Sequence, residues 1–334
     1  MNNPLMEQLA LKSPLWQAPL PFDLINAHAA GHISAAGALG MIPLGPQSTF
    51  DSLDAALDAY QENHQAPAFC FTHALPETTS VEINEDAARH IYDQLGVSYS
   101  PIPEGAAFQD LLELAIDYKP RAIGFARGVP ERETLQTIHQ AGINTFAICH
   151  SVSEAIVAQD FGIHTIVLQG TEAGGIHYRF NNALSEPAQP ALTLLSQVRQ
   201  YIHRPIVVWG DFPQAQDVVA ALIAGAQGVM IDRPWLACTD AGLSDEQRAH
   251  IIRTPETNSQ RSNHFSALPM RHLPTPLYHN LRSDYRERDV VLHHLFERHP
   301  DWRVLSVSAS TVNEQASIAD LVQAYAESIQ DYIA

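Results

Sequence analysis

A run of small and polar residues at 169–178 is the part of the chain best suited to chemistry. It directly follows an apolar run at 165–168, which predicts a buried strand. Gly174 and Gly175 have no side chains, so their backbone N–H groups can approach a ligand closely. His177 comes two residues later, and an imidazole can accept or donate a proton. A strand that leads into such a segment is typical of a cofactor site at the end of a barrel strand.

The composition excludes several classes of partner. The chain has 334 residues and a formal net charge of -18, which argues against nucleic acid or an anionic membrane. No apolar run is long enough to span a bilayer, and the first residues do not resemble a signal peptide. We therefore expect a small-molecule substrate, with a homodimer as an open alternative. Cys70, Cys149 and Cys238 are widely spaced and match no zinc pattern, so we expect no metal site and a cytoplasmic setting.

Alternating strand and helix patterns define the expected fold. The candidate strands lie at 15–18, 39–42, 68–71, 122–125, 145–148, 165–168, 206–208 and 228–231. They are almost continuously apolar, as strands buried on both faces are. The candidate helices lie at 24–36, 52–63, 83–95, 107–118, 131–141, 153–161, 190–203 and 213–224.

Eight strand–helix units predict an α/β fold, a (β/α)8 TIM barrel over residues 14–238. A doubly wound open sheet is the alternative. Residues 239–334 are predicted to form a loop-rich, partly helical extension packed on the barrel. Within it, 239–302 is polar with little periodicity, and 321–333 has the pattern of a closing helix.

Several motifs together resemble the nitronate monooxygenase (formerly 2-nitropropane dioxygenase) family of FMN-dependent barrels. They lie at 17–20, 37–40, 124–130, 141–143, 169–175, 209–210, 225–229 and 264–266, so the resemblance covers about residues 14–270. It implies FMN as the cofactor. The cofactor-binding residues that it implies are Ala18, Pro19, Gln169, Gly174, Gly175, Gly210, Gly228 and Arg233.

The resemblance also implies an activity. A nitronate, or a similar small carbanion-type substrate, would be oxidised at the flavin with molecular oxygen, and His177 would act as general base or orient the substrate anion. His150, Arg127 and Trp209 are expected in the substrate pocket. One alternative is an NAD(P)H-dependent flavin reductase of enoyl thioesters or quinones. Another is a barrel that has lost FMN and serves as a binding or partner subunit.

The chain departs from the family pattern at several site positions. The family places histidine directly after the paired glycines, whereas here Ile176 takes that place and His177 follows. Asp23, Asp211 and Asp232 stand near positions where the family has small residues around the phosphate. An unpaired carboxylate about 4 Å from a phosphate would repel it by roughly 1–4 kcal/mol. Arg233 offers either a direct phosphate contact or an ion pair with Asp232, and Phe22 and Trp209 also replace small residues. These departures favour the FMN-free alternative.

Overall fold

Eight parallel strands form the centre of the molecule. The computed structural model describes residues 3–61, 66–75, 81–180, 189–277, 281, 284–313 and 315–333. The strands are β1 (Leu15–Gln17), β2 (Ile42–Leu44), β3 (Ala68–Ala74), β4 (Ala122–Arg127), β5 (Asn144–Cys149), β6 (Thr165–Gln169), β8 (Ile206–Trp209) and β9 (Gly228–Ile231). Their order in the sheet is β1-β9-β8-β6-β5-β4-β3-β2. An isolated parallel bridge between Trp16 and Leu39 joins the two ends, so the predicted barrel is confirmed and the open sheet is excluded.

The segment that joins the two ends explains why one strand was misplaced. A strand was predicted at 39–42, but β2 begins only at Ile42. The side chain of Gln17 lies between the two segments: its amide donates to the carbonyl of Met41 at 3.0 Å and accepts from the N–H of Met41 at 2.9 Å. A side chain thus replaces the backbone ladder at Met41, and regular pairing starts one residue later.

The barrel interior is filled by side chains. Trp16 of β1 and Phe146 of β5 meet edge to face, with ring centroids 5.4 Å apart. Gly124 of β4 makes room for this pair, because a Cβ at Gly124 would lie 2.0 Å from the Phe146 ring. The barrel centre is therefore a packed core, and any ligand site must lie at its rim.

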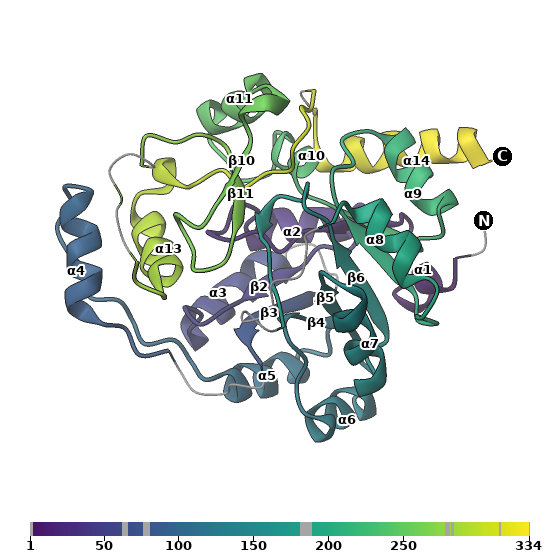
Figure 1. The fold of residues 1–334 in the computed structure, drawn as a ribbon, viewed down its shortest axis with the longest axis horizontal. Helices are drawn as coiled ribbons and strands as arrows, with labels where there is room; N and C mark the ends of the chain where they lie inside the picture. Colours follow the sequence, from purple (N-terminus) through teal and green to yellow (C-terminus); the bar gives the residue numbers. More distant parts are fainter. Residues whose placement is uncertain are drawn as a thin grey trace.

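Helices surround the strands (Figure 1). Those of the barrel are α2 (Ala27–Ala35), α3 (Phe50–Gln61), α5 (Phe108–Asp117), α6 (Arg132–Gln140), α7 (Val152–Phe161), α8 (Ala191–Val198) and α9 (Ala215–Ile223). Helix α4 (Glu85–Gln94) stands apart from the strands and contacts α13 (Arg288–Arg298). The helix predicted at 24–36 begins later, because Asn26 caps α2 by accepting the N–H of Ala29 at 2.9 Å. The predicted end of α3 at 63 lies outside the described residues. A short helix, α1 (Pro4–Gln8), precedes β1.

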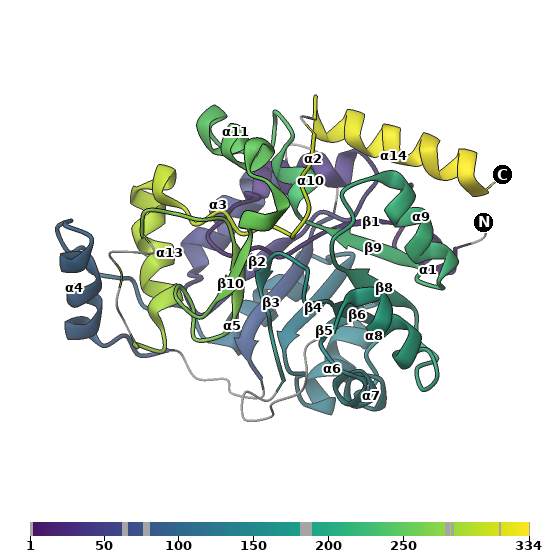
Figure 2. The ribbon, with the colours of Figure 1, turned by 45° about the horizontal axis from the view of Figure 1, so that its top comes forward.

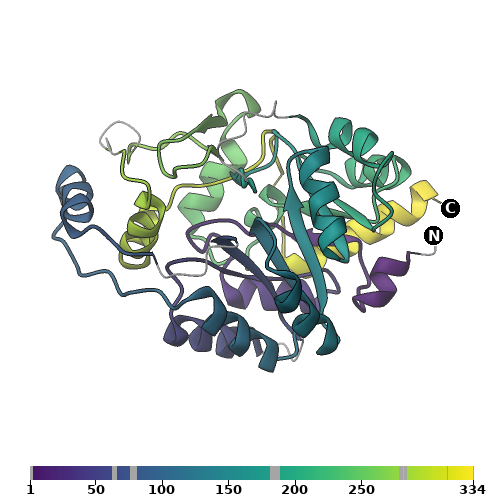
Figure 3. The same cartoon turned by 60° about the horizontal axis from the view of Figure 1, so that its bottom comes forward.

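Further helices follow β9. They are α10 (Arg233–Leu236), directly after β9, and α11 (Asp245–Arg253), α13 (Arg288–Arg298) and α14 (Ile318–Ile333) in the extension proposed for residues 239–334, with short 3-10 turns at Glu256–Asn258 and Pro300–Trp302. Helix α14 contacts α9 and α2, and the two chain termini lie close together (Figures 2 and 3). Within the described part of the chain, no helix is both long and apolar enough to cross a membrane.

A small sheet that was not predicted connects the extension to the barrel rim. It is antiparallel and contains β7 (Gly175–Ile176), β11 (Met270–His272) and β10 (Gln260–Ser262). The pairing joins residues about 95 positions apart, Met270 to Ile176 and Arg271 to Gly175. Strand β7 has only two residues, which is too short for any periodicity to reveal it.

Candidate active site

The segment from Ile176 to Tyr178 runs beside β11, and this decides which side chains face the cavity. β11 holds it by the pairing above, and His177 donates its backbone N–H to the carbonyl of Pro269 at 2.8 Å. Successive side chains of an extended chain point to opposite faces. Ile176 and Tyr178 accordingly line the cavity described next, whereas His177 points away from it and its Nε2 lies 3.1 Å from the carbonyl oxygen of Ala173.

A cavity of about 170 Å³ lies at the carboxyl ends of β1 to β4. Its polar lining comes from strand ends and from the extension: Asp23, Gln47, Thr72, His73, Arg127, Tyr178, Ser266, Arg286, Glu287, Asp289 and His293. Ligand pockets for larger molecules usually enclose roughly 300–1,000 Å³. A cavity of this size and lining suits a small polar substrate.

Arg127 and His73 give the cavity its chemistry. Arg127 is the last residue of β4, and its Nε is buried without a hydrogen-bond partner among the described residues. His73 is 5% exposed, and both of its ring nitrogens are likewise without a described partner. Burial, and then the charge of Arg127, lower the pKa of His73 to about 4. At neutral pH the cavity thus contains a fixed cation beside a neutral imidazole.

Asp289 of α13 completes this group from the extension. Burial raises the pKa of its carboxyl group, and Arg127 partly offsets that rise. Its Oδ2 accepts the hydroxyl of Ser266 at 3.3 Å. Sequence reasoning missed both His73 and Asp289. The position of His73 directly after the third predicted strand was a usable signal, whereas nothing in the sequence connects Asp289 with the end of β4.

His150, which was predicted to line the substrate pocket, lies instead beside His177. The two rings are 5.8 Å apart, and neither residue borders the cavity. Burial is the main cause that lowers both pKa values, to about 3 for His177 and well below 6.5 for His150. Glu154 holds this region in place by accepting the backbone N–H groups of His150 and Phe180 at 2.7 and 3.0 Å. Both imidazoles are therefore neutral and enclosed, and the catalytic role of His177 stays a prediction.

The positions that the resemblance assigns to the flavin phosphate converge on Asp232. Its fully buried carboxylate accepts four N–H groups. Oδ1 accepts the backbone N–H groups of Arg233 and Ser308, both at 2.6 Å. Oδ2 accepts the backbone N–H of Gly174 at 3.0 Å and the indole N–H of Trp209 at 3.1 Å. Burial still raises the pKa of this carboxyl group, although the hydrogen bonds oppose the rise.

Arg233 neither contacts Asp232 through its guanidinium nor offers that group to a ligand. Its side chain is fully buried, and its Nη atoms donate to backbone carbonyls. The acceptors are the carbonyl oxygens of Ile251, Thr254, Ser308, Ala309 and Ser310. Both alternatives raised for Arg233, phosphate contact and ion pairing, are therefore replaced by a structural role in this arrangement.

The remaining predicted cofactor residues divide between two ends of the barrel. Ala18, Pro19, Gln169, Gly175 and Gly210 lie at the carboxyl ends of their strands, and the amide of Gln169 donates to the carbonyl of Ile176 at 3.0 Å. Gly228 is the first residue of β9, near the carbonyl of Pro14, so it lies at the end of the strand away from the cavity. Its position does not support a cofactor contact.

Trp209 fills space beside the paired glycines. Its side chain is fully buried, and a Cβ at Gly175 would lie 3.4 Å from its ring. It does not line the cavity, where it was expected. The indole thus occupies the rim between Gly175 and Asp232, and it contributes a donor to the carboxylate.

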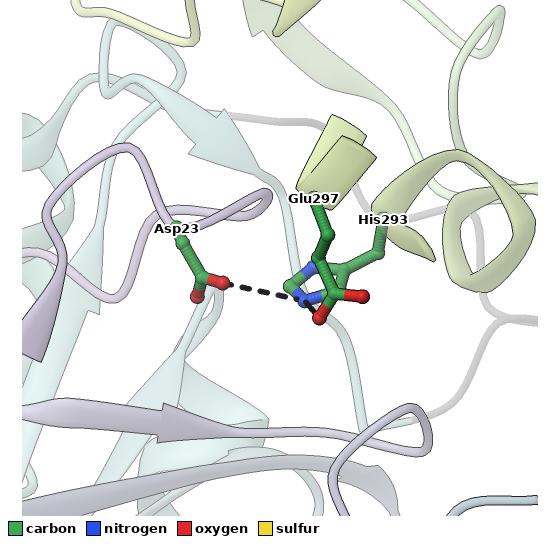
Figure 4. A group of neighbouring side chains, drawn as sticks. All are labelled: Asp23, His293 and Glu297. Carbon is green, nitrogen blue, oxygen red and sulfur yellow. Dashed lines mark ion pairs between the residues drawn. The ribbon is translucent and has the colours of Figure 1, made fainter. Parts of the chain in front are cut away.

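At the cavity mouth an ion-paired group links the first loop to α13 (Figure 4). His293 Nε2 lies 3.4 Å from Asp23 Oδ2 and 3.7 Å from Glu297 Oε1. Phe22, just before Asp23, packs edge to face on Phe296 with ring centroids 5.1 Å apart. Asp23, predicted near the phosphate, therefore anchors the extension at the cavity entrance.

Comparison with known proteins decides the family. The family model "Nitronate monooxygenase" matches residues 2–299. The chain belongs to the nitronate monooxygenase family. A probable nitronate monooxygenase of Bacillus subtilis (strain 168) is 26% identical over 269 residues, covering 79% of this chain and 77% of that protein. A probable nitronate monooxygenase of Staphylococcus haemolyticus (strain JCSC1435) is 25% identical over 273 residues, covering 79% and 76%.

Solved structures agree on the fold. The nitroalkane oxidase from Streptomyces ansochromogenes superposes with a TM-score of 0.80 at 20% identity, covering 97% of this chain and 98% of that chain. FabK from Thermotoga maritima superposes with a TM-score of 0.69 at 14% identity, covering 99% and 98%. The nitronate monooxygenase family comprises FMN-dependent oxidoreductases, so the predicted family, enzyme class and cofactor class are confirmed.

The residues at the phosphate positions do not fit a flavin phosphate in this arrangement. Asp232 already takes the four N–H groups that converge there. The backbone of Val307 and Ser308 also covers Gly174, where even a Cβ would lie 2.6 Å from the Val307 carbonyl carbon. FMN can enter this family member's site only if Asp232 and residues 307–310 move.

Proposed function

We propose that this chain oxidises a small carbon acid that arrives as an anion, a nitronate in keeping with its family. The observation that carries the proposal is Arg127, whose partly buried guanidinium faces a cavity of about 170 Å³. A guanidinium binds the two oxygens of a nitronate in the same planar, bidentate way as it binds a carboxylate. FMN is the redox cofactor of this enzyme class.

The low basicity of the histidines favours a substrate that is already ionised. A general base works best when its pKa lies near the working pH. The pKa values of His73 and His177 are lowered to about 4 and about 3, so both are weak bases at neutral pH. We infer that His73 orients the bound anion through a hydrogen bond, and that the chain does not deprotonate a neutral nitroalkane efficiently.

The charge in the cavity favours this function over the reductase alternative, because Arg127 offers a binding group for a small anion. An enoyl thioester or quinone reductase must also place a nicotinamide ring against its flavin. A small nitronate needs only the region around Arg127, His73 and Tyr178.

An anaerobic titration of the FMN-loaded protein tests the proposal. Addition of a nitronate alone should bleach the flavin absorbance, and NADH or NADPH alone should not. The parent nitroalkane, kept neutral, serves as the matched control and should bleach the flavin at least tenfold more slowly. Bleaching by a nicotinamide but not by a nitronate would support the reductase instead.

We also infer that the protein works in the cytoplasm and propose a homodimer as its assembly. Cys70, Cys149 and Cys238 are all buried and unpaired, which is typical of proteins kept in a reducing compartment. A homodimer is the simplest assembly to test, by light scattering after size-exclusion chromatography. A mass of about twice 36.8 kDa would support it.

A further inference from the structure

The surroundings of Asp232 have the chemistry of an anion site. Three backbone N–H groups and the indole N–H of Trp209 point at one carboxylate, two on each oxygen. Converging backbone N–H groups of this kind bind phosphate and other anions in many proteins. In this protein the bound anion is the side-chain carboxylate of Asp232.

The location of these donors matches where barrels bind phosphate. Gly174 follows β6, Trp209 ends β8, and Arg233 follows β9. These three strands are neighbours in the sheet. Their carboxyl ends therefore meet at one part of the rim, the region in which TIM barrels hold phosphate groups.

Residues 307–310 close this region from outside. Ser308 donates its N–H to Asp232, Ala309 donates to the carbonyl of Glu172 at 3.1 Å, and Ser310 donates to Asp211 Oδ2 at 2.7 Å. Three successive N–H groups thus bond to the loops after β9, β6 and β8. The carbonyls of the same three residues accept from Arg233, so the segment is held on both sides.

We propose that Asp232 stands in for the flavin phosphate, and that Asp232 with residues 307–310 forms a latch that FMN must displace. This rests on the proposed function, because it takes FMN as the ligand. The carboxylate and the phosphate compete for the same four N–H groups. FMN therefore binds only the fraction of molecules in which the latch is open, and its apparent affinity is reduced by that fraction.

The test is the affinity for FMN, measured by quenching of FMN fluorescence without any substrate. Asp232→Gly removes the carboxylate and keeps the backbone donors, so it should bind FMN at least tenfold more tightly than the unchanged chain. Asp301→Gly removes an exposed carboxylate from the same extension and should leave the affinity unchanged. Equal or weaker FMN binding by Asp232→Gly, or no binding by either protein, would overturn the proposal.

A second measurement covers the case in which Asp232→Gly is unstable. The variant leaves buried N–H groups without an acceptor, which is costly. Inorganic phosphate should then raise its Tm, or permit its refolding, at concentrations that do not affect the unchanged chain. A variant that phosphate does not stabilise would contradict an anion site.

The outcomes separate this proposal from the proposed function. If FMN-loaded wild-type protein fails to bleach with nitronate while Asp232→Gly binds FMN more tightly, the latch stands and the proposed substrate is wrong. If nitronate bleaches the flavin and Asp232→Gly changes nothing, the substrate stands and the latch is wrong.

Discussion

The backbone N–H of Gly174 donates to the carboxylate of Asp232 at 3.0 Å, across 58 positions of sequence. The bond ties the loop after β6 to the end of β9. Gly174 belongs to the paired glycines by which the family is recognised, yet in this chain its N–H serves an internal carboxylate. The motif is thus retained while the group that it binds has changed.

Gly174→Ala should destabilise the protein, because a Cβ at this position would lie 2.6 Å from the carbonyl carbon of Val307. The new methyl group is fixed by the backbone of residue 174 and the carbonyl of Val307 is buried backbone, so neither can rotate away. Overpacking of this kind usually costs about 1–3 kcal/mol. Urea unfolding should show a lower midpoint with an unchanged slope. An unchanged midpoint would mean that residues 307–310 are not seated on Gly174.

Arg127→Gln should raise the KM for a nitronate at least tenfold and lower kcat less, because the lost interaction binds the anion before reaction. Arg127→Lys keeps the charge but not the planar pair of donors, so its KM should lie between those of the unchanged chain and Arg127→Gln. Arg132→Gln removes an exposed arginine of α6 and is the matched control. If Arg127→Gln and Arg127→Lys both leave KM unchanged, Arg127 does not contact the substrate.

His73→Gln and His177→Gln should have different effects. His73 lines the cavity, so its substitution should lower kcat/KM about tenfold or more with little loss of bound FMN. His177 faces away and lies near the carbonyl of Ala173, so its substitution should lower Tm and leave kcat/KM within about threefold. The reverse pattern would restore His177 as the catalytic histidine. Steady-state rates and thermal melts of both variants decide which histidine acts in catalysis.

The barrel was predictable from the sequence because its strands are buried on both faces. Each strand is a short apolar run, and the glycines that follow β6 belong to motifs fixed by close backbone approach. The second strand is the exception. Gln17 bonds to the backbone of Met41, so the second strand starts later than its apolar residues suggest.

The site was less predictable because contacts from distant residues shape it. The direction of His177 depends on pairing with β11, about 95 residues away. The role of Asp232 depends on Ser308, 76 residues away. The sequence drew attention to Asp232 as a carboxylate near the expected phosphate position. It contained no signal that four N–H groups would satisfy that carboxylate.

Ile176→His should place an imidazole in the cavity, because Ile176 already faces it and takes the position of the family histidine. Unlike His177, this position borders the cavity, so the new imidazole would lie within reach of a substrate proton. A positioned base contributes about 10²–10⁴-fold to a proton transfer. The variant should therefore gain at least tenfold in rate with a neutral nitroalkane and little with its nitronate. Equal changes for both substrates would contradict a gain in base catalysis.

Stability should fall as the pH drops below about 6.5, and His73 should contribute to that fall. Its pKa is lowered to about 4 in the folded chain, so the folded chain binds fewer protons than the unfolded chain between about pH 4 and 6.5. The free energy of unfolding then decreases with falling pH across that window and levels off for this group below it. At about 1.4 kcal/mol per pH unit, His73 accounts for roughly 3 kcal/mol. His73→Gln should flatten the pH dependence of urea unfolding, whereas His203→Gln, at an exposed position, should not. If the free energy of unfolding changed equally with pH in the unchanged chain and in both variants, His73 would not be desolvated.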